Sequence, residues 1–435
     1  MVRSEGGYPE ATQRRKGLAT ISRRHASEIR EGGWSVLLRK TRTALKALSR
    51  YLLALLLFPF WPVVLVVRLM KPFVLVRFGP LRSRNIGHFA ANTEMYLCRR
   101  EAGLDDPRAK DIFYHLGPVC NRQLKIMWER ILHVSPLARP MDFVNRAVPG
   151  GGKHVILEPP RGDFDIHGLL QRLPVHLAFT PEEERAGQEG LRAMGIPEEA
   201  PFICFHARDA GYHKDANPER DFSHTEHRSS HVRDHVPAAG EMARRGYYAV
   251  RMGSMVSEPL PAASPMVIDY ATRYRSDFMD IFLGAKCYFY IGDQSGLDAI
   301  PGIFRRPVAT VNLSQFQRAR TWGPDDLFVT KKLWLRKERR LVTFREIFDW
   351  HIDDVRRGEE YERLDIEVIE NTPEEITALA VEMDERLKRT WQPAAEDEEL
   401  QRRFWSIYKA DKLFHGEILS RVGADFLRRN RELLD

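Results

Sequence analysis

The chain has 435 residues, which is too long for one ordinary core and predicts at least two folded domains. Hydrophobic residues make up 43% and charged residues 29%, proportions that exclude a largely disordered chain. The formal net charge is +7, but residues 1–72 hold 14 Lys and Arg against 4 Asp and Glu. The other 363 residues carry 53 basic and 56 acidic side chains, so the body is slightly acidic and a nucleic-acid partner is disfavoured.

The four cysteines are scattered, at Cys98, Cys120, Cys204 and Cys287. None stands at the paired spacing of a zinc ribbon or a disulfide framework. Reduced thiols in a cytoplasmic protein are therefore the expected state.

The N-terminal region combines basic residues with one long apolar run. Residues 1–35 are expected to be poorly ordered. Tyr51 to Val67 is an uncharged run of 17 residues with basic residues on both flanks. As a straight helix it would cover about 26 Å, less than a hydrocarbon core of about 30 Å. Pro59 and Pro62 lie within the run and are expected to break or kink it.

Three interpretations of this run compete: a true span, a buried pair of core helices and a monotopic anchor. The basic residues on both flanks suit a segment whose two ends lie at the same membrane face. A buried pair of core helices would not explain the basic residues that precede the run. The anchor accounts for the charges and the prolines together. We therefore expect residues 1–72 to be membrane-associated, with residues 36–72 contacting the cytoplasmic face of the inner membrane.

The rest of the chain alternates apolar strands with amphipathic helices, which predicts an α/β fold with parallel sheets. The first series has strands at 73–79, 111–117 and 153–160 and helices at 86–101, 121–132 and 181–197. The second series has strands at 201–209, 247–253, 266–271, 287–292 and 306–312 and helices at 238–246, 277–285 and 295–304. Further helices are expected at 374–390, 397–410 and 424–433.

This pattern predicts two Rossmann-like domains that face a cleft. The expected boundaries are an N-terminal segment at 1–72, an acceptor domain at 73–195, a donor-binding domain at 196–392 and C-terminal helices at 393–435. The strand–loop–helix turns contain neither Gly-x-Gly-x-x-Gly nor a Walker sequence. A dinucleotide oxidoreductase and a P-loop enzyme are therefore disfavoured.

Three polar clusters fall where strands of the second series end, the edge at which open α/β sheets bind ligands. They are His206, Arg208 and Asp209; residues 251–254; and Gly292, Asp293, Ser295 and Gly296. An arginine can bind a phosphate bidentately, and free backbone N–H groups at a helix start suit an anion. Each cluster also has an ordinary explanation as a helix cap or a surface ion pair. Together the three predict a phosphate-like or sugar-like ligand.

The segment from 222 to 237 holds four histidines, at 224, 227, 231 and 235. Three of them are spaced by four, so a zinc site has to be considered. Pro237 and the serine pair suggest that a helix begins only near His235, which would separate the histidines. We therefore expect no metal site and read Arg228 as a phosphate partner.

In the first series, Arg84, His88, Asn92 and Glu94 lie at and just inside a helix start. His88 and Asn92 share one helical face. Either His88 or Glu94 could act as a general base on an acceptor hydroxyl, with Arg84 and Asn92 as acceptor contacts. The alternative for Glu94 is a favourable interaction with the helix dipole. The sequence does not choose between the two bases.

Residues 70–435 resemble a family of bacterial surface-polysaccharide glycosyltransferases. The resemblance is carried by LVRFGPLRSRNIGHFAANTEMYL, FHARD, HRSSHVRDHVPAAGEMARRGYYAVRMGS, SDFMDIFLGAKCYFYIGDQSGLDAIPGIF and RVGADFLRRNRELL. It implies a GT-B fold and transfer of a sugar from a nucleotide-sugar donor to a glycan or lipid-linked glycan. We expect no metal and no cofactor besides the donor substrate, because the chain has no clear Asp-x-Asp metal motif. Asp163 and Asp165 have that spacing but stand before a short apolar stretch, which argues against them.

Two more distant resemblances point to individual donor contacts. FHARD is similar to the His-x-Arg strand end of GDP-fucose-using fucosyltransferases, which implies that Arg208 binds the donor diphosphate. The match ends after Asp209, where this chain continues with Ala-Gly-Tyr. GDQSGLDAI resembles the Asp-Thr/Ser-Gly helix start of heptosyltransferase-like enzymes and implies that Ser295 and Gly296 lie near the donor phosphates.

Other functions remain open at this point. A nucleotide-sugar epimerase can share the two-domain fold but would not need the hydrophobic anchor. A non-catalytic membrane-bound scaffold with a degenerate sugar site is another possibility, and it predicts that Arg208→Ala leaves function intact.

Overall fold

The computed structural model describes residues 41, 57–158, 162–209, 223–261, 264–412 and 414–435. The chain packs as two units. Of the described residues, one unit contains those up to 78 together with 137–155, and the other contains those of 79–136 and 156–435. The expectations for residues 1–35, and for the first part of the apolar run up to residue 56, lie outside the described residues. The domain boundaries expected from the sequence stay predictions.

The smaller unit is built on α2 (Phe60–Leu69), α5 (Ala138–Ala147) and the 3-10 turn η1 (Gly151–His154). Helix α2 begins directly after Pro59, and Pro62 is its third residue. Proline is tolerated there because the first N–H groups of a helix have no partner within it. Among the described residues, no helix combines the length and apolar character that crossing a membrane requires. The membrane association of residues 36–72 stays a prediction.

The chain after α2 forms a two-stranded sheet of β1 (Leu75–Leu81) and β2 (Ala109–His115). Helices α3 (Ile86–Glu101), α4 (Arg122–Ile131), α6 (Leu169–Arg172) and α7 (Pro181–Ala193) accompany it. This sheet is smaller than the one expected for residues 73–195. The strand predicted at 153–160 reduces to a single bridge between Val155 and Phe78, since the preceding Gly150 turns the chain with φ 86°.

The second series forms a seven-stranded sheet in the order β12-β8-β7-β6-β3-β4-β5. All of its pairings are parallel, which confirms the predicted large parallel sheet. Its strands are β3 (Phe202–His206), β4 (Tyr248–Arg251), β5 (Val267–Ile268), β6 (Tyr290–Asp293), β7 (Val308–Leu313), β8 (Leu327–Thr330) and β12 (Arg421–Val422). The order runs outward from β3 to β5 and then restarts at β6. The chain direction across the sheet therefore reverses between β3 and β6.

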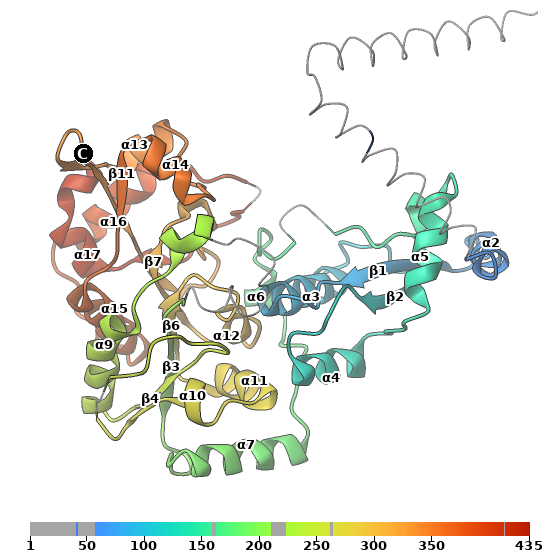
Figure 1. Cartoon of the computed structure of the whole chain (residues 1–435), viewed down its shortest axis with the longest axis horizontal. Coiled ribbons are helices and arrows are strands. Elements are labelled where there is room, and N and C mark those ends of the chain that lie inside the picture. Colours follow the sequence, from blue (N-terminus) through green and yellow to red (C-terminus); the bar gives the residue numbers. More distant parts are fainter. Residues whose placement is uncertain (1–40, 42–56, 159–161, 210–222, 262–263, 413) are drawn as a thin grey trace, which may run out of the picture. The chain divides into compact units, whose positions relative to one another are not determined.

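Side chains of β3 alternate between two cores, as the two-residue period of a strand requires. Ile203 and Phe205 face the core that contains α9 (Val232–Arg244) and α15 (Pro373–Leu387). Phe202 and Cys204 face a second core with α10 (Tyr270–Arg273) and α11 (Asp277–Lys286). Helices α9 and α15 pack against each other beside the sheet (Figure 1). Burial on both faces explains why these strands read as continuous apolar runs.

Several elements differ from the sequence expectation. Helix α9 begins at Val232, with Pro237 inside it, rather than near His235. Helix α12 (Ala299–Ile303) begins four residues later than expected, so Ser295 and Gly296 lie in a turn. A small antiparallel sheet of β10 (Arg340–Leu341), β9 (Lys332–Leu335) and β11 (Ile366–Ile369) was not foreseen.

The remaining helices and 3-10 turns of the described residues are short, and most lie in the last third of the chain. They are α13 (Phe344–Asp349), α14 (Gly358–Arg363), α16 (Asp397–Ile407) and α17 (Ala424–Arg429), with 3-10 turns η2 (Ser223–Arg228), η3 (Phe316–Arg318) and η4 (Arg431–Leu434). The last 3-10 turn replaces the end of the helix expected at 424–433.

Candidate functional site

A cavity of about 470 Å³ opens at the carboxyl ends of β3 and β6, where the strand order reverses. This is the position at which doubly wound sheets bind their ligands. Residues that follow these strands line one part of it, and the start of α3 lines another. Of the residues predicted to form the site, Arg84, His88, Glu94, His206, Arg208, Arg228, Ser295 and Gly296 line the cavity.

Two close backbone approaches shape this wall. A Cβ on Gly292 would lie 2.5 Å from the carbonyl oxygen of His206, so the β3–β6 pairing requires glycine there. A Cβ on Gly87 would lie 2.7 Å from the Cα of Gly296. The first turn of α3 therefore rests directly on the loop that follows β6. This contact brings the side chains of α3 to the ends of the strands.

Arg208 and Arg228 place two cations at the cavity. Arg208 is only 9% exposed, and burial lowers its pKa to about 10 despite the nearby Asp293. Burial also lowers the pKa of Arg228 to about 9, and the charges of Arg208 and Arg318 lower it further. The Nε of Arg228 is buried with no hydrogen-bond partner among the described residues. Its Nη2 donates to the carbonyl oxygen of Gln294 at 3.4 Å.

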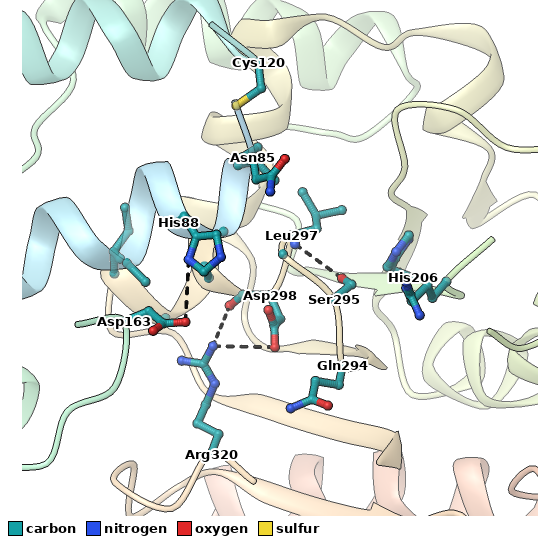
Figure 2. Close-up of a pocket in the computed structure, with 18 of the residues that line it drawn as sticks. Asn85, His88, Cys120, Asp163, His206, Gln294, Ser295, Leu297, Asp298 and Arg320 are labelled. Atoms are coloured by element: carbon teal, nitrogen blue, oxygen red, sulfur yellow. Dashed lines mark hydrogen bonds and ion pairs between the residues drawn. The ribbon is translucent and has the colours of Figure 1, made fainter. Parts of the chain in front are cut away.

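Two further arginines line the cavity and were missed from the sequence. Arg318 donates through Nε to Asp354 at 2.9 Å, and Arg320 donates to the carbonyl oxygen of Asp298 at 3.1 Å. Figure 2 shows Arg320 reaching both this carbonyl oxygen and the Asp298 carboxylate. Both arginines follow the end of β7, at the edge where the other polar clusters lie. The strand-end rule that found Arg208 would have found them if it had been extended to β7.

Asp293 is not among the residues that line the cavity, although it was predicted to contact the donor. Its carboxylate is fully buried and accepts hydrogen bonds from the Arg208 backbone N–H at 2.7 Å and Asn312 Nδ2 at 2.9 Å. Ser230 Oγ also donates to it, and His235 Nε2 lies 3.6 Å away. Burial opposes the ionisation of Asp293, but these partners hold its pKa well below its ordinary value. Asp293 therefore braces the strand end that carries Arg208. Gly292 likewise serves the strand pairing.

The N-terminus of α3 adds backbone donors to the cavity. Asn85 occupies the cap position, but its side chain makes no capping hydrogen bond. Residues 84–88 all line the cavity, and the first N–H groups of a helix lack partners within it. The sixteen-residue helix also directs the positive end of its dipole here. The cavity wall thus combines arginines with free backbone donors.

His88 lines the cavity and contacts two neighbouring side chains. Its Nδ1 lies 3.1 Å from Asn92 Oδ1 and 3.7 Å from a carboxylate oxygen of Asp163, and its side chain is 42% exposed (Figure 2). Asn92 also donates to Glu158 and is not among the lining residues. Asp163 was not predicted to be a partner of His88. Its pairing with His88 joins residues 75 positions apart.

Glu94 is placed differently from its expected role. Its carboxylate is fully buried, with one oxygen 2.7 Å from Arg305 Nη2 and 3.0 Å from His176 Nδ1. The hydrogen bond to Glu94 raises the pKa of His176, although burial opposes this. Glu94 is thus engaged by Arg305 and His176, whereas the side chain of His88 is partly exposed at the cavity.

Glu94, Cys98 and His176 are also the one group among the described residues whose ligand atoms lie close enough to hold a metal ion. However, Arg305 Nη2 lies against Glu94 and 3.8 Å from Cys98 Sγ, so a guanidinium occupies the place of a cation. Burial raises the pKa of the Cys98 thiol to about 12, which disfavours the thiolate that a metal needs. This group fits a metal poorly.

The histidines after residue 222 point to different partners. His231 Nδ1 lies 2.7 Å from Glu258, His235 faces Asp293, and the His227 ring packs edge-on against Tyr361. The side chain of His224 lies outside the described residues. These three rings therefore have separate partners, and the expectation of no metal stays a prediction.

Residues 251–254, the polar cluster at the end of β4, begin a loop that is held by hydrogen bonds. Asp209 accepts hydrogen bonds from the Ser257 backbone N–H at 2.5 Å and from Ser257 Oγ at 2.7 Å. Arg251 Nη2 donates to the carbonyl oxygen of Glu258 at 2.7 Å. The loop is fixed at this end, and Gly253, Ser254 and Met255 face the cavity. Asp209 therefore positions the loop and also lines the cavity together with the loop's first residues.

No protein-family model and no curated protein sequence matches this chain. Among solved structures, it is similar to a family 9 glycosyltransferase from Veillonella parvula, at TM-score 0.41 and 12% identity over 72% of this chain and 97% of that one. It is similar to the ADP-heptose lipopolysaccharide heptosyltransferase II of E. coli, at TM-score 0.31 and 14% identity over 54% and 84%. It is also similar to a dodecameric iron-containing heptosyltransferase in complex with ADP-D-β-D-heptose, at TM-score 0.28 and 8% identity over 56% and 59%.

Proposed function

We propose that this protein is a GT-B-like glycosyltransferase that binds a nucleoside-diphosphate sugar in the cavity between the ends of β3 and β6. The observation that carries the proposal is the pair of buried arginines there. Arg228 has an unpartnered Nε among the described residues, and Arg208 and Arg318 repel its charge. Desolvated cations that crowd one another favour a multiply charged anion. A diphosphate supplies such an anion.

The same groups suit the departure of that diphosphate. In the proposed reaction an acceptor hydroxyl oxygen attacks the anomeric carbon, and the bond from that carbon to the β-phosphate oxygen breaks. Arg208, Arg228 and the backbone donors at the α3 N-terminus stabilise the negative charge that develops on the leaving group. We propose no metal for this step because these fixed charges supply the electrostatic stabilisation.

His88 is the proposed general base. Its Nδ1 faces Asn92 and Asp163, which leaves Nε2 to take the proton of the acceptor hydroxyl. Asp163 stabilises the imidazolium that forms, and Arg84 on the same wall is the proposed acceptor contact. The proposal thus assigns the donor to the strand ends and the acceptor to the α3 side.

We also propose that the acceptor is a lipid-linked glycan of a bacterial surface polysaccharide and that the enzyme works at the cytoplasmic face of the inner membrane. Support comes from the apolar run that ends in α2. Val66 is 54% exposed and Leu69 77% exposed on this helix. An exposed apolar face beside basic residues suits an interfacial anchor.

The donor site can be tested by calorimetric titration of the protein with UDP-, GDP-, ADP- and dTDP-sugars and with a CMP-sugar. We expect one nucleoside-diphosphate sugar to bind, and Arg228→Ala to weaken it about 30-fold, since a charged hydrogen bond contributes about 2 kcal/mol. Arg336→Ala, which removes an exposed arginine paired with Glu367, is the matched control. A well-folded protein that binds none of these compounds would remove the basis for a transferase.

A further inference from the structure

The smaller unit carries a surface that the cavity does not use. In α2 the single charged residue is Arg68, and the exposed side chains around it are apolar. Leu69 and Phe73, at the end of this helix and just after it, are 77% and 89% exposed. This apolar surface lies on the same unit as the glycine-rich segment 149–154, whose sequence is Pro-Gly-Gly-Gly-Lys-His.

Arg68 fastens the glycine-rich segment to the end of α2. Its Nη2 donates to the carbonyl oxygens of Asn145 at 2.7 Å and Val148 at 3.0 Å, and its Nη1 donates to that of Pro149 at 3.0 Å. A Cβ on Gly151 would lie 2.5 Å from Nη2, so the loop lies directly on the guanidinium. The guanidinium of Arg68 is therefore engaged by hydrogen bonds within the smaller unit.

The far end of the segment is fixed to the chain that follows α2. His154 Nδ1 lies 2.7 Å from the carbonyl oxygen of Val76, and Val155 bridges Phe78. These attachments bring Lys71, in the turn after α2, beside Lys153, in η1. Both lysines are exposed, and neither has an acidic partner within the described part of the chain.

The ammonium groups of Lys71 and Lys153 lie close enough for their positive charges to repel each other. The side chain of Lys153 lowers the pKa of Lys71, through contact and through charge. Next to them, Gly150 and Gly152 leave open space where other residues would carry a Cβ. Two adjoining cations beside an open backbone loop suit an anion with several oxygens. The exposed apolar residues alongside suit acyl chains.

We propose that Lys71, Lys153 and the loop at 150–152 bind the phosphate of an anionic phospholipid, with the apolar face of α2 at the acyl boundary. The inference rests on the membrane attachment proposed above and adds a headgroup site to it. An amphipathic surface element gains from both buried apolar area and attraction to anionic lipid. A free phosphate would leave the neighbouring apolar face unexplained.

The test measures binding of the full chain to vesicles of phosphatidylcholine, with and without phosphatidylglycerol. We expect phosphatidylglycerol to strengthen binding and Lys71→Ala/Lys153→Ala to weaken it about 30-fold, from about 1 kcal/mol for each lysine near the surface. Lys110→Ala/Lys337→Ala removes two exposed lysines elsewhere and should leave binding unchanged. Both lysines of the test pair are exposed, so the variant should fold; its thermal melt checks this.

Hydrogen exchange reports binding at the proposed headgroup site itself. Its result for residues 149–154 is separate from any membrane contact that the basic N-terminal residues make. We expect peptides covering 149–154 to be protected by vesicles with phosphatidylglycerol and not by soluble glycerol phosphate. Equal protection by glycerol phosphate would overturn the lipid assignment. Unchanged binding of the Lys71/Lys153 variant would overturn the headgroup site and leave the apolar attachment standing. Absence of binding to both vesicle types would overturn the attachment as well.

Discussion

At the residue scale, the cavity contains a buried arginine whose charge destabilises the ligand-free fold. Burial and the neighbouring arginines lower the pKa of Arg228 to about 9, which means that its charged form is disfavoured in the folded protein. Sites that bind or transform ligands commonly keep such costly groups. The stability of the ligand-free protein and its affinity for a diphosphate should therefore move in opposite directions.

Arg228→Met tests this opposition directly. Removing the buried guanidinium should stabilise the ligand-free protein by about 1 kcal/mol, because an apolar side chain of similar length replaces an unmatched buried charge. Denaturant unfolding without ligand measures the change. A destabilised Arg228→Met protein would mean that Arg228 is part of the structural framework rather than a charge held for a ligand.

His88 and Asp163 should affect turnover more than affinity. Loss of a general base typically costs 10²–10⁴-fold in rate, so His88→Ala should lower kcat by about 100-fold or more with little change in donor KM. Asp163→Asn should lower kcat less, since it removes only the charge that supports the imidazolium. Steady-state kinetics would check both. If Glu94→Gln lowered kcat while His88→Ala did not, the assignment of the base would be reversed.

The buried pair of His235 and Asp293 predicts a pH dependence of stability. Burial opposes protonation of His235, yet Asp293 raises its pKa above the ordinary 6.5. A raised pKa gives a stabilisation that is complete below 6.5 and lost as pH rises through the folded-state value. The unfolding free energy lost in His235→Gln should thus be largest below pH 6.5 and shrink at alkaline pH. A difference that stayed constant with pH would contradict an ionic His235–Asp293 interaction.

At the scale of elements, the position of α3 depends on a glycine contact. A Cβ at Gly87 would lie 2.7 Å from backbone of Gly296, so α3 can pack on the loop after β6 only without a side chain there. Since this packing brings His88 to the cavity, the contact couples stability to the site.

Gly87→Ala should destabilise the protein by about 1–3 kcal/mol and weaken donor binding, because the backbone must move to relieve the overlap. Gly240→Ala is the matched control. Gly240 lies in α9 with open space around its Cβ position, so alanine should be neutral or should stabilise by up to about 1 kcal/mol. Chemical denaturation measures both variants. Equal effects of the two substitutions would contradict the tight contact.

The elements that the sequence predicted best are those with local signals. The helix at 86–101 is found at those residues, and the apolar strands around 203, 250 and 290 form the centre of the sheet. Strands β8 and β12 were missed because their pairing is set by distant partners and β12 is only two residues long. Helix α9 starts earlier than expected because its packing tolerates Pro237.

The site was predictable where a residue type and a strand end coincide, as for Arg208. Sequence could not tell that Asp293 turns inward, because its partners Asn312 and His235 are far away in the chain. The same limit hid Asp163 as the partner of His88. A strand end predicts where polar groups gather, while the three-dimensional packing decides which of them meet the ligand.

At the scale of the whole molecule, the membrane proposal concerns the smaller unit and the transferase proposal the larger one. They should therefore separate experimentally. Val66→Asp/Leu69→Asp places two charges on the exposed face of α2, where more than half of each side chain is exposed. We expect sedimentation with vesicles to fall at least about tenfold, because apolar contact is replaced by charge. Donor binding in solution should stay unchanged; its loss would contradict the independence of the two sites.

The most direct test of the central claim is a crystal structure with the nucleoside diphosphate that binds most tightly. The account predicts that its two phosphates lie between Arg208, Arg228 and the turn at 294–296, with the N-terminus of α3 facing them. A diphosphate bound elsewhere, with Arg228 still unpartnered, would contradict the assignment of this cavity as the donor site.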